Sequence, residues 1–180
     1  MKNVIKTTLA IALISIIASC QSPEKKAQDR LMNMEKTVAK DTSKMPDKKK
    51  IYDLFCTYKN FADSFPKNDS VPEYLFRAGR LASGLTYLME AVNCYNKVYE
   101  NYPASKRAPF CLFMEAFIYE NQLHGTEKAK KLYEEFMKKY PDHELAKDVK
   151  FSLDHIGKSD EDLIKEFEAK QKAKNSWGNW

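Results

Sequence analysis

The chain has few of the residues that would indicate a β-sheet or a nucleotide-binding loop. Only five of its 180 residues are glycine, and no glycine-rich phosphate loop is present. No stretch alternates valine, isoleucine or threonine with polar residues, as half-buried strands do. The apolar content is 43%, with ten tyrosines and ten phenylalanines, which is enough to fill one hydrophobic core. The sequence therefore predicts an all-α protein.

The chain also lacks the residue pairs that would indicate catalysis or metal binding. Its three histidines, His124, His143 and His155, do not share metal-ligand spacing, and neither an HExxH nor a paired CxxC motif occurs. We therefore predict a protein that is not an enzyme, with no catalytic residue, no metal and no small-molecule cofactor. A pair formed by a cysteine and a histidine that meet only in the folded chain stays open as the alternative.

The excess of positive charge is small. The formal net charge is +5 at pH 7, and two of the lysines, Lys2 and Lys6, belong to an N-terminal segment that we expect to be removed. Nucleic-acid-binding domains carry a much denser positive charge. We therefore expect no nucleic-acid partner.

Residues 1–19 have the pattern of a secretory signal peptide. Two lysines precede the run from Leu9 to Ala18, which is apolar apart from one serine and, at about ten residues, is too short to cross a bilayer as a helix. The run ends in Ile-Ala-Ser before Cys20, which resembles the lipobox of bacterial lipoproteins. This resemblance implies cleavage before Cys20, lipidation of Cys20, a tether over residues 20–23 and attachment to a membrane through the lipid. An ordinary signal peptide followed by a chance cysteine is the alternative.

Three further cysteines, Cys56, Cys94 and Cys111, follow Cys20. An odd number argues against a disulfide framework. Each lies in a predicted helix beside aromatic residues, where a free cysteine packs as a small apolar side chain. We expect these thiols to contribute to packing and not to chemistry.

Three segments repeat one pattern at intervals of 37 and 38 residues. Residues 58–66 read YKNFADSFP, residues 95–103 read YNKVYENYP and residues 133–141 read YEEFMKKYP. Each has a tyrosine, an apolar residue three positions later, an aromatic residue at seven and a proline at eight, and a small or apolar residue precedes each tyrosine by four. The residues before the proline share one stripe of a helix, and the proline ends that helix. A period of this size indicates stacked helical repeats.

The pattern predicts eight helices in four antiparallel pairs. They span residues 24–41, 47–65, 70–85, 88–102, 105–123, 126–140, 143–156 and 160–173. Ser70 and Glu73 are expected to form a capping box at the start of the third helix, and Ser105 and Asp142 to cap the fifth and the seventh. The fifth helix is apolar almost all round, so we place it at the centre of the stack. Residues 174–180, with both tryptophans, are expected to form a flexible tail.

The second helix of each unit resembles that of the tetratricopeptide repeat. That family has a small residue, an aromatic residue four positions later, a small or apolar residue three after that, and a proline twelve from the start. Two segments fit this spacing and a third begins with a larger residue: Ala91-Tyr95-Val98-Pro103, Ala129-Tyr133-Phe136-Pro141 and Leu54-Tyr58-Phe61-Pro66. The resemblance implies a right-handed, tetratricopeptide-like α-solenoid over residues 24–173. Two first helices are about one turn longer than usual, and the first helices lack the family's tryptophan and glycine.

The last predicted helix follows the pattern only in part. Leu163 and Phe167 repeat its first two positions, but Lys170 and Lys174 replace the apolar residues that should follow. The end of a repeat array needs a polar outer face. We therefore expect residues 160–173 to form a polar cap.

Long, aromatic-rich repeats behind a lipobox look most like the envelope lipoproteins of Gram-negative bacteria, among them the repeat lipoprotein of the outer-membrane barrel-assembly machinery. This resemblance implies an outer-membrane lipoprotein of the cell envelope that faces the periplasm, with the cell surface as the alternative face. It also implies a non-catalytic scaffold for protein–protein interaction, with outer-membrane protein assembly as one such role. The alternative is a periplasmic ligand-binding protein or enzyme that uses the concave groove of the solenoid as a pocket.

Arginine is scarce and unevenly placed. The chain has 26 lysines and four arginines, which are Arg30, Arg77, Arg80 and Arg107. In the tetratricopeptide family the first helix of each unit lines a concave groove. Mapped on this chain, the groove positions are Glu73, Arg77, Arg80, Arg107, Phe110, Met114, Phe117 and His155. Residues three or four apart share one helical face.

These groove positions predict a protein or peptide partner that carries a carboxylate, because the planar guanidinium group suits carboxylates where an ammonium group does not. The alternative is that the arginines pair with Glu73 and neighbouring acids within the stack.

Overall fold

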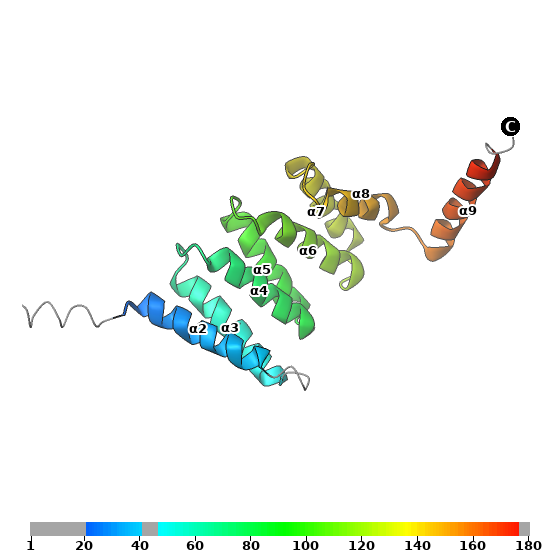
Figure 1. Cartoon of the computed structure of the whole chain (residues 1–180). Helices are drawn as coiled ribbons and strands as arrows, with labels where there is room; N and C mark the ends of the chain where they lie inside the picture. Colours follow the sequence, from blue (N-terminus) through cyan, green and yellow to red (C-terminus); the bar gives the residue numbers. More distant parts are fainter. Residues whose placement is uncertain (1–20, 41–46, 177–180) are drawn as a thin grey trace, which may run out of the picture. The chain divides into compact units, whose positions relative to one another are not determined.

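The computed structural model describes residues 21–40 and 47–176, apart from the side chains of residues 160 and 173–176. Within these residues all regular secondary structure is helical (Figure 1). The helices are α2 (Pro23–Ala39), α3 (Lys48–Ser64), α4 (Val71–Gly84), α5 (Leu88–Asn101), α6 (Ala108–Asn121), α7 (Thr126–Lys139), α8 (Ala146–His155) and α9 (Asp160–Ser176). The predicted all-α fold is confirmed. The predicted signal peptide, Cys20 and the tail from Trp177 lie outside the described residues.

The helices begin and end close to the predicted residues except at the starts of α6 and α8 and at the end of α9. α9 continues to Ser176, so residues 174–176 are helical and not part of the predicted tail. α6 and α8 begin at Ala108 and Ala146, three residues after the predicted starts, because a turn precedes each of them. Before α6, the backbone N–H groups of Ser105 and Ala108 donate to carbonyls three residues earlier, at 2.9 and 3.0 Å. The Ser105 Oγ accepts a bond from the backbone N–H of Arg107 at 3.1 Å. Ser105 therefore caps this turn and not the helix, so the predicted cap is wrong.

The other two predicted caps are also wrong. Ser70 does occupy the N-cap position of α4, but its side chain makes no capping hydrogen bond. The Ser70 backbone has φ −83° and ψ −10°, whereas a capping side chain reaches the first amides from an extended backbone. The capping box with Glu73 is therefore absent from α4. At α8 the N-cap residue is Leu145, not Asp142.

The chain divides into two compact units, one ending at Asn68 and one that follows it. α2 and α3 form a helical pair in the first unit, with Leu31 of α2 fully buried. The Tyr58 hydroxyl of α3 donates to the carboxylate of Glu35, and Asn68 Nδ2 donates to Glu24 Oε1 at 2.6 Å. Apolar packing and these side-chain bonds together hold the pair.

In the second unit, α4 to α8 pack in sequence, each on the next. α6 lies between α5 and α7, as predicted for the most apolar helix (Figure 1). The stripe residues of the three repeated segments are at most 4% exposed in both units. They are Leu54, Tyr58, Phe61, Ala91, Tyr95, Val98, Ala129, Tyr133 and Phe136. The predicted core is confirmed.

α4 and α5 approach each other closely at Gly79. A Cβ atom at this position would lie 2.5 Å from Cε1 of Tyr95, whose side chain is fully buried. That separation is well inside van der Waals contact, so only glycine fits here without displacing the tyrosine ring. The expectation that the first helices carry no such glycine is wrong for α4.

The repeat tyrosines differ in how their hydroxyl groups are bonded. Tyr133 donates to Glu120 Oε2 of the paired first helix at 2.7 Å. The Tyr95 hydroxyl lies near Ser83, but within the described part of the chain both of these buried oxygens lack a hydrogen bond of normal geometry. Burial raises the pKa of Tyr95 to about 12. The hydroxyl group of the repeat tyrosine is therefore hydrogen-bonded in the α6–α7 pair and lacks such a bond in the α4–α5 pair.

We expect Tyr133→Phe and Tyr95→Phe to affect stability differently. Removal of the Tyr133 hydroxyl deprives Glu120 of the shorter of its two side-chain hydrogen bonds and should lower the free energy of unfolding by about 1–2 kcal/mol. Removal of the Tyr95 hydroxyl deletes an unsatisfied buried group and should be neutral or stabilising. Urea unfolding of both variants measures the difference, and a larger loss for Tyr95→Phe would contradict these assignments.

α6 buries a carboxyl group in the second unit. Glu115 is 2% exposed, and Asn96 Nδ2 of α5 donates to its Oε2 at 3.5 Å. Burial raises the pKa of Glu115. Lys128 and the bond from Asn96 oppose this shift, whereas the neighbouring charges of Glu100 and Glu135 add to it.

Because its pKa is raised, Glu115 binds a proton more tightly in the folded chain than in the unfolded chain. Its contribution to stability is full below the unfolded value near 4.5 and is lost as the pH rises through the folded pKa. Glu115→Gln imitates the protonated form, so it should raise the free energy of unfolding by about 1 kcal/mol at pH 8. Chemical unfolding between pH 5 and 8 checks this prediction. If the gain in the free energy of unfolding of Glu115→Gln over the wild type grew as the pH fell, the prediction would be contradicted.

The cysteines of the described chain are free thiols. Cys94 and Cys111 are buried, and Cys56 is partly buried. Burial raises the pKa of Cys111, which disfavours the reactive thiolate. Their surroundings therefore favour a packing role.

The C-terminal helix differs from the other second helices. α9 diverges from α8 after the connection Ile156–Ser159 (Figure 1). Phe167 of α9 is 63% exposed, although Tyr133, the corresponding residue of α7, is fully buried. Ile164 is also more than half exposed. α9 is therefore not the purely polar cap that the sequence predicts, because the side chains of Phe167 and Ile164 are exposed to solvent.

Candidate partner-binding face

The candidate site is a surface on the first helices of two successive pairs, which we call the α4–α6 face. It consists of Glu73, Arg77 and Arg80 of α4, Arg107 at the N-cap of α6, and Phe110, Met114 and Phe117 of α6. All of these side chains are at least partly exposed. Helical spacing places the α4 members on one side of their helix, and the same holds for those of α6.

Glu73 joins the two helices of the face. Its Oε1 accepts a bond from Arg77 Nε at 2.8 Å, and its Oε2 accepts one from Arg107 Nε at 2.6 Å. Burial opposes ionisation of Glu73, but the bonds from Arg107 and Arg77 outweigh it, so the pKa of Glu73 is lowered. The intramolecular pairing that the sequence leaves open as an alternative is therefore present. In this pairing, the carboxylate of Glu73 binds the guanidinium groups of both Arg77 and Arg107.

Arg107 also stacks on aromatic rings. Its guanidinium carbon lies 4.3 Å from the ring centroid of Phe76 and 5.9 Å from that of Phe110. Such stacking fixes the plane of a guanidinium group and contributes a cation–π attraction. Phe76 is a site residue that sequence reasoning missed. Its position beside Arg77 in the sequence was the available signal.

The remaining members of the face combine charge and apolar surface. Arg80 is exposed and forms no ion pair with another described residue. Met114 is partly buried, and Phe117 is 39% exposed and lies 6.2 Å from Phe113 between ring centroids. Three arginines with one glutamate leave a positive excess on the α4–α6 face, which also carries the apolar side chains of α6.

His155 belongs to a different surface. Its ring stacks on Phe151, with 4.1 Å between the ring centroids, and its Nδ1 lies 2.6 Å from the Phe151 carbonyl oxygen. Both residues line a cleft between α8 and α9. The structure therefore places His155 with α9 and not with the α4–α6 face, because its side chain folds back by one helical turn onto Phe151.

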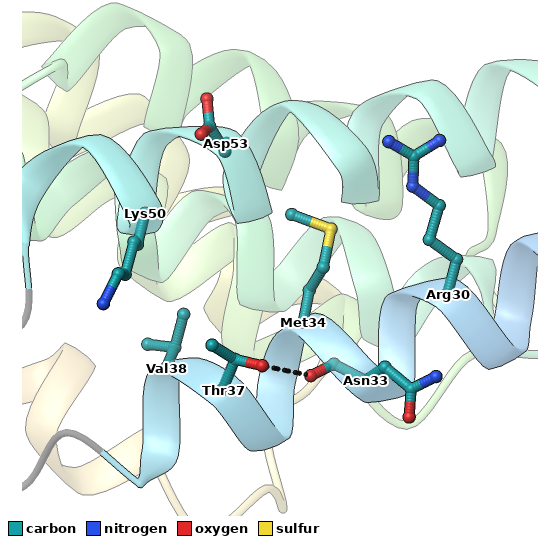
Figure 2. A pocket seen from close by; sticks show the side chains of 7 residues that line it. All are labelled: Arg30, Asn33, Met34, Thr37, Val38, Lys50 and Asp53. Carbon is teal, nitrogen blue, oxygen red and sulfur yellow. Dashed lines mark hydrogen bonds between the residues drawn. The ribbon is translucent and has the colours of Figure 1, made fainter.

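The first unit has a recess of its own between α2 and α3 (Figure 2). Its volume is about 490 Å³, and it is lined by Arg30, Asn33, Met34, Thr37, Val38, Lys50 and Asp53. The Thr37 hydroxyl donates to the Asn33 carbonyl at 2.8 Å, and Lys49 pairs with Asp53 at 3.1 Å. Met34 and Val38 are the apolar residues of this lining. The recess thus combines apolar surface with a polar rim, where Thr37 bonds within α2 and Asp53 pairs within α3.

The described residues offer neither a metal centre nor a membrane span. Within residues 21–40 and 47–176, histidine, cysteine, aspartate and glutamate side chains form no group of three or more that could hold a metal ion. In the same part of the chain, no helix combines the length and the apolar character needed to cross a bilayer.

Comparison with known families matches residues 110–143 to the tetratricopeptide repeat. The matched segment covers nearly all of α6, the whole of α7 and the proline turn that follows. The fold is thus that of a helical-repeat protein, and the chain contains a tetratricopeptide repeat. Repeats of this family generally mediate protein–protein interaction. No curated protein matches the chain.

Proposed function

We propose that this protein is a non-catalytic scaffold, anchored by lipid in the bacterial cell envelope, that binds a segment of a protein partner on the α4–α6 face. The observation that carries the proposal is the charge arrangement of that face. Glu73 is shared by Arg77 and Arg107, and Arg80 has no ion pair with any described residue. An uncompensated guanidinium group on a face that also carries apolar side chains is suited to an acidic segment.

The chemistry of the face specifies the kind of segment. A guanidinium group can give two parallel hydrogen bonds to one carboxylate, and Arg80 is exposed and able to do so. Met114 and Phe117 offer apolar surface one helix away. Arginine and aromatic side chains are common at the energetic centres of interfaces. We therefore expect the partner segment to combine a carboxylate with an apolar side chain.

The envelope location is supported by the sequence before α2. The lipobox-like residues that end in Cys20 support membrane attachment through lipid, and the resemblance to envelope lipoproteins supports the periplasmic side of the outer membrane and a role in outer-membrane protein assembly. Only Gln21 and Ser22 separate Cys20 from α2. Ser22 caps the helix by accepting a bond from the Lys25 N–H at 3.2 Å. A lipid on Cys20 would therefore hold the first unit close to the membrane surface.

We expect the mature chain to begin at an acylated Cys20. Mass spectrometry of the N-terminal peptide, extracted from membranes, should show lipid on this cysteine and no residue from the segment 1–19. The matched control is Cys20→Ser, which should abolish the modification and release or mislocalise the chain. An unmodified Cys20 in a chain that is recovered without membranes would rule out the anchoring part of the proposal.

The binding part is tested by crosslinking pull-down of the membrane-attached chain. The account predicts that the same protein is recovered from independent preparations and that its recovery falls when Arg80 is replaced by glutamate. Recovery that is indifferent to Arg80→Glu would show that the partner binds elsewhere.

A further inference from the structure

The three most exposed large apolar side chains among the described residues lie together at the C-terminal end. Phe151 of α8 is 65% exposed, and Phe167 and Ile164 of α9 are 63% and 57% exposed. With Leu163 and His155 they line an open cleft of about 560 Å³ between the two helices. Apolar side chains gathered in this way on a soluble surface mark an interaction site.

The preceding helix pairs show what such side chains contact. In the α4–α5 and α6–α7 pairs, a phenylalanine of the first helix packs on the repeat tyrosine of the second. The ring pairs are Phe76–Tyr95 at 6.0 Å and Phe113–Tyr133 at 6.1 Å between centroids. Phe151 follows Phe113 by 38 residues, and Phe167 follows Tyr133 by 34. Phe151 therefore offers a surface for a second-helix aromatic residue, and Phe167 is such a residue.

Asp154 of α8 disfavours packing of α9 from the same chain. In the α4–α5 pair the repeat tyrosine lies against Gly79, and the equivalent residue of α6 is the buried Ala116. In α8 the same position holds the charged Asp154. A second-helix ring that packed at this position, as Tyr95 packs on Gly79, would bury Asp154, and burial of a charge without a partner is costly. An α9 from another copy is not joined to this α8 by the short connection Ile156–Ser159 and can contact Phe151 without covering Asp154.

We propose that two copies of this chain associate through their C-terminal ends, with α9 of each copy lying in the α8–α9 cleft of the other. Phe167 and Ile164 of one copy contact Phe151 of its partner, and two-fold symmetry forms the contact twice. Because α9 has 17 residues, it is about 25 Å long. Two such helices provide contacts on the scale of a specific dimer, roughly 1,200 Å² in total.

The N-terminal half of α9 and helix α7 carry opposite charge excess. Residues 160–168 of α9 contain five acidic residues and one lysine, and residues 169–176 add three lysines, whereas α7, on which α8 packs, contains five lysines and three glutamates. Opposite charge excess favours approach of one copy's α9 to the α7–α8 end of the other.

The first test is the mass of the full-length chain in solution. Light scattering of the detergent-solubilised protein across a range of concentrations should show a dimer. Replacement of both Ile164 and Phe167 by serine should weaken dimerisation at least tenfold and leave helix content unchanged by circular dichroism. Met89→Ser is the matched control, since Met89 is 52% exposed on α5, and this variant should remain a dimer. A wild-type monomer at all concentrations overturns the proposal.

The second test distinguishes the copies. A photoreactive benzoylphenylalanine in place of Phe167 is introduced into the full chain, and unlabelled and isotopically heavy copies are mixed before irradiation. Adducts that join a heavy α9 peptide to a light α8 peptide support the proposal. Adducts found only within one copy would show that α9 closes on its own α8, and adducts found only with a different protein would assign the cleft to that protein. Either result would contradict the proposal that α9 of a second copy occupies the cleft.

Discussion

Phe136→Ala is expected to lower the free energy of unfolding by about 3–5 kcal/mol, the usual range for truncation of a buried aromatic side chain. The Phe136 side chain is fully buried in α7. Its ring lies 5.5 Å from that of Tyr140 and 5.8 Å from that of His143 between centroids, and it belongs to the core cluster that contains Leu112 and Val149. Contacts on several sides leave the neighbouring side chains little freedom to fill the cavity, so most of the lost packing is not recovered.

Phe117→Ala is the matched control for this prediction. It makes the same substitution on the adjacent helix α6, but Phe117 is 39% exposed, so the expected loss is about 1 kcal/mol or less. Urea unfolding followed by circular dichroism measures both variants. Equal losses would mean that the stripe assigned to the core of α7 has the wrong helical phase.

Replacement of Arg77 and Arg80 together by lysine is expected to weaken partner binding about tenfold or more. Lysine keeps the charge of each position but loses the planar fork that can bind one carboxylate through two bonds. Both arginines are exposed, so the free energy of unfolding should change little. Titration of the wild-type and variant chains with the recovered partner measures the ratio of dissociation constants.

Arg30→Lys is the control for the arginine prediction. Arg30 is an exposed arginine of the first unit, outside the α4–α6 face, and its replacement should leave binding unchanged. If the double variant of Arg77 and Arg80 also binds normally, these arginines serve the internal pairing with Glu73 and not a partner.

The helices and the core could be predicted from the sequence because both depend on local periodicity. Tyr95 and Phe136 were assigned to the core from their spacing within one helix and from the proline that follows, and both are fully buried. The side of α4 that bears Arg77 and Arg80 followed from the same spacing. Hydrophobic stripes and helix breakers act within a few residues, so no knowledge of the tertiary structure was needed.

The missed features depend on contacts between elements that are distant in the sequence. Arg107 bonds to Glu73 across 34 residues and stacks on Phe76, a geometry that no single-helix pattern contains. The role of Gly79 depends on how deeply Tyr95 enters α4. Likewise, the sequence pattern of α9 indicated a cap, but its packing depends on what α8 offers, and there Asp154 replaces a small residue. The prediction that Ser105 caps the helix was wrong for a local reason, because a three-residue turn precedes α6.

The central claim is that the α4–α6 face binds a protein, and site-specific photo-crosslinking in living cells tests it most directly. A photoreactive residue is placed at position 117 of the full-length chain, and in a second strain at position 130, where an exposed lysine of α7 lies outside the face. The account predicts one protein adduct of defined mass from position 117 that disappears when Arg77 and Arg80 are replaced by lysine, and none from position 130. No adduct from position 117, or the same adduct from both positions, would contradict it.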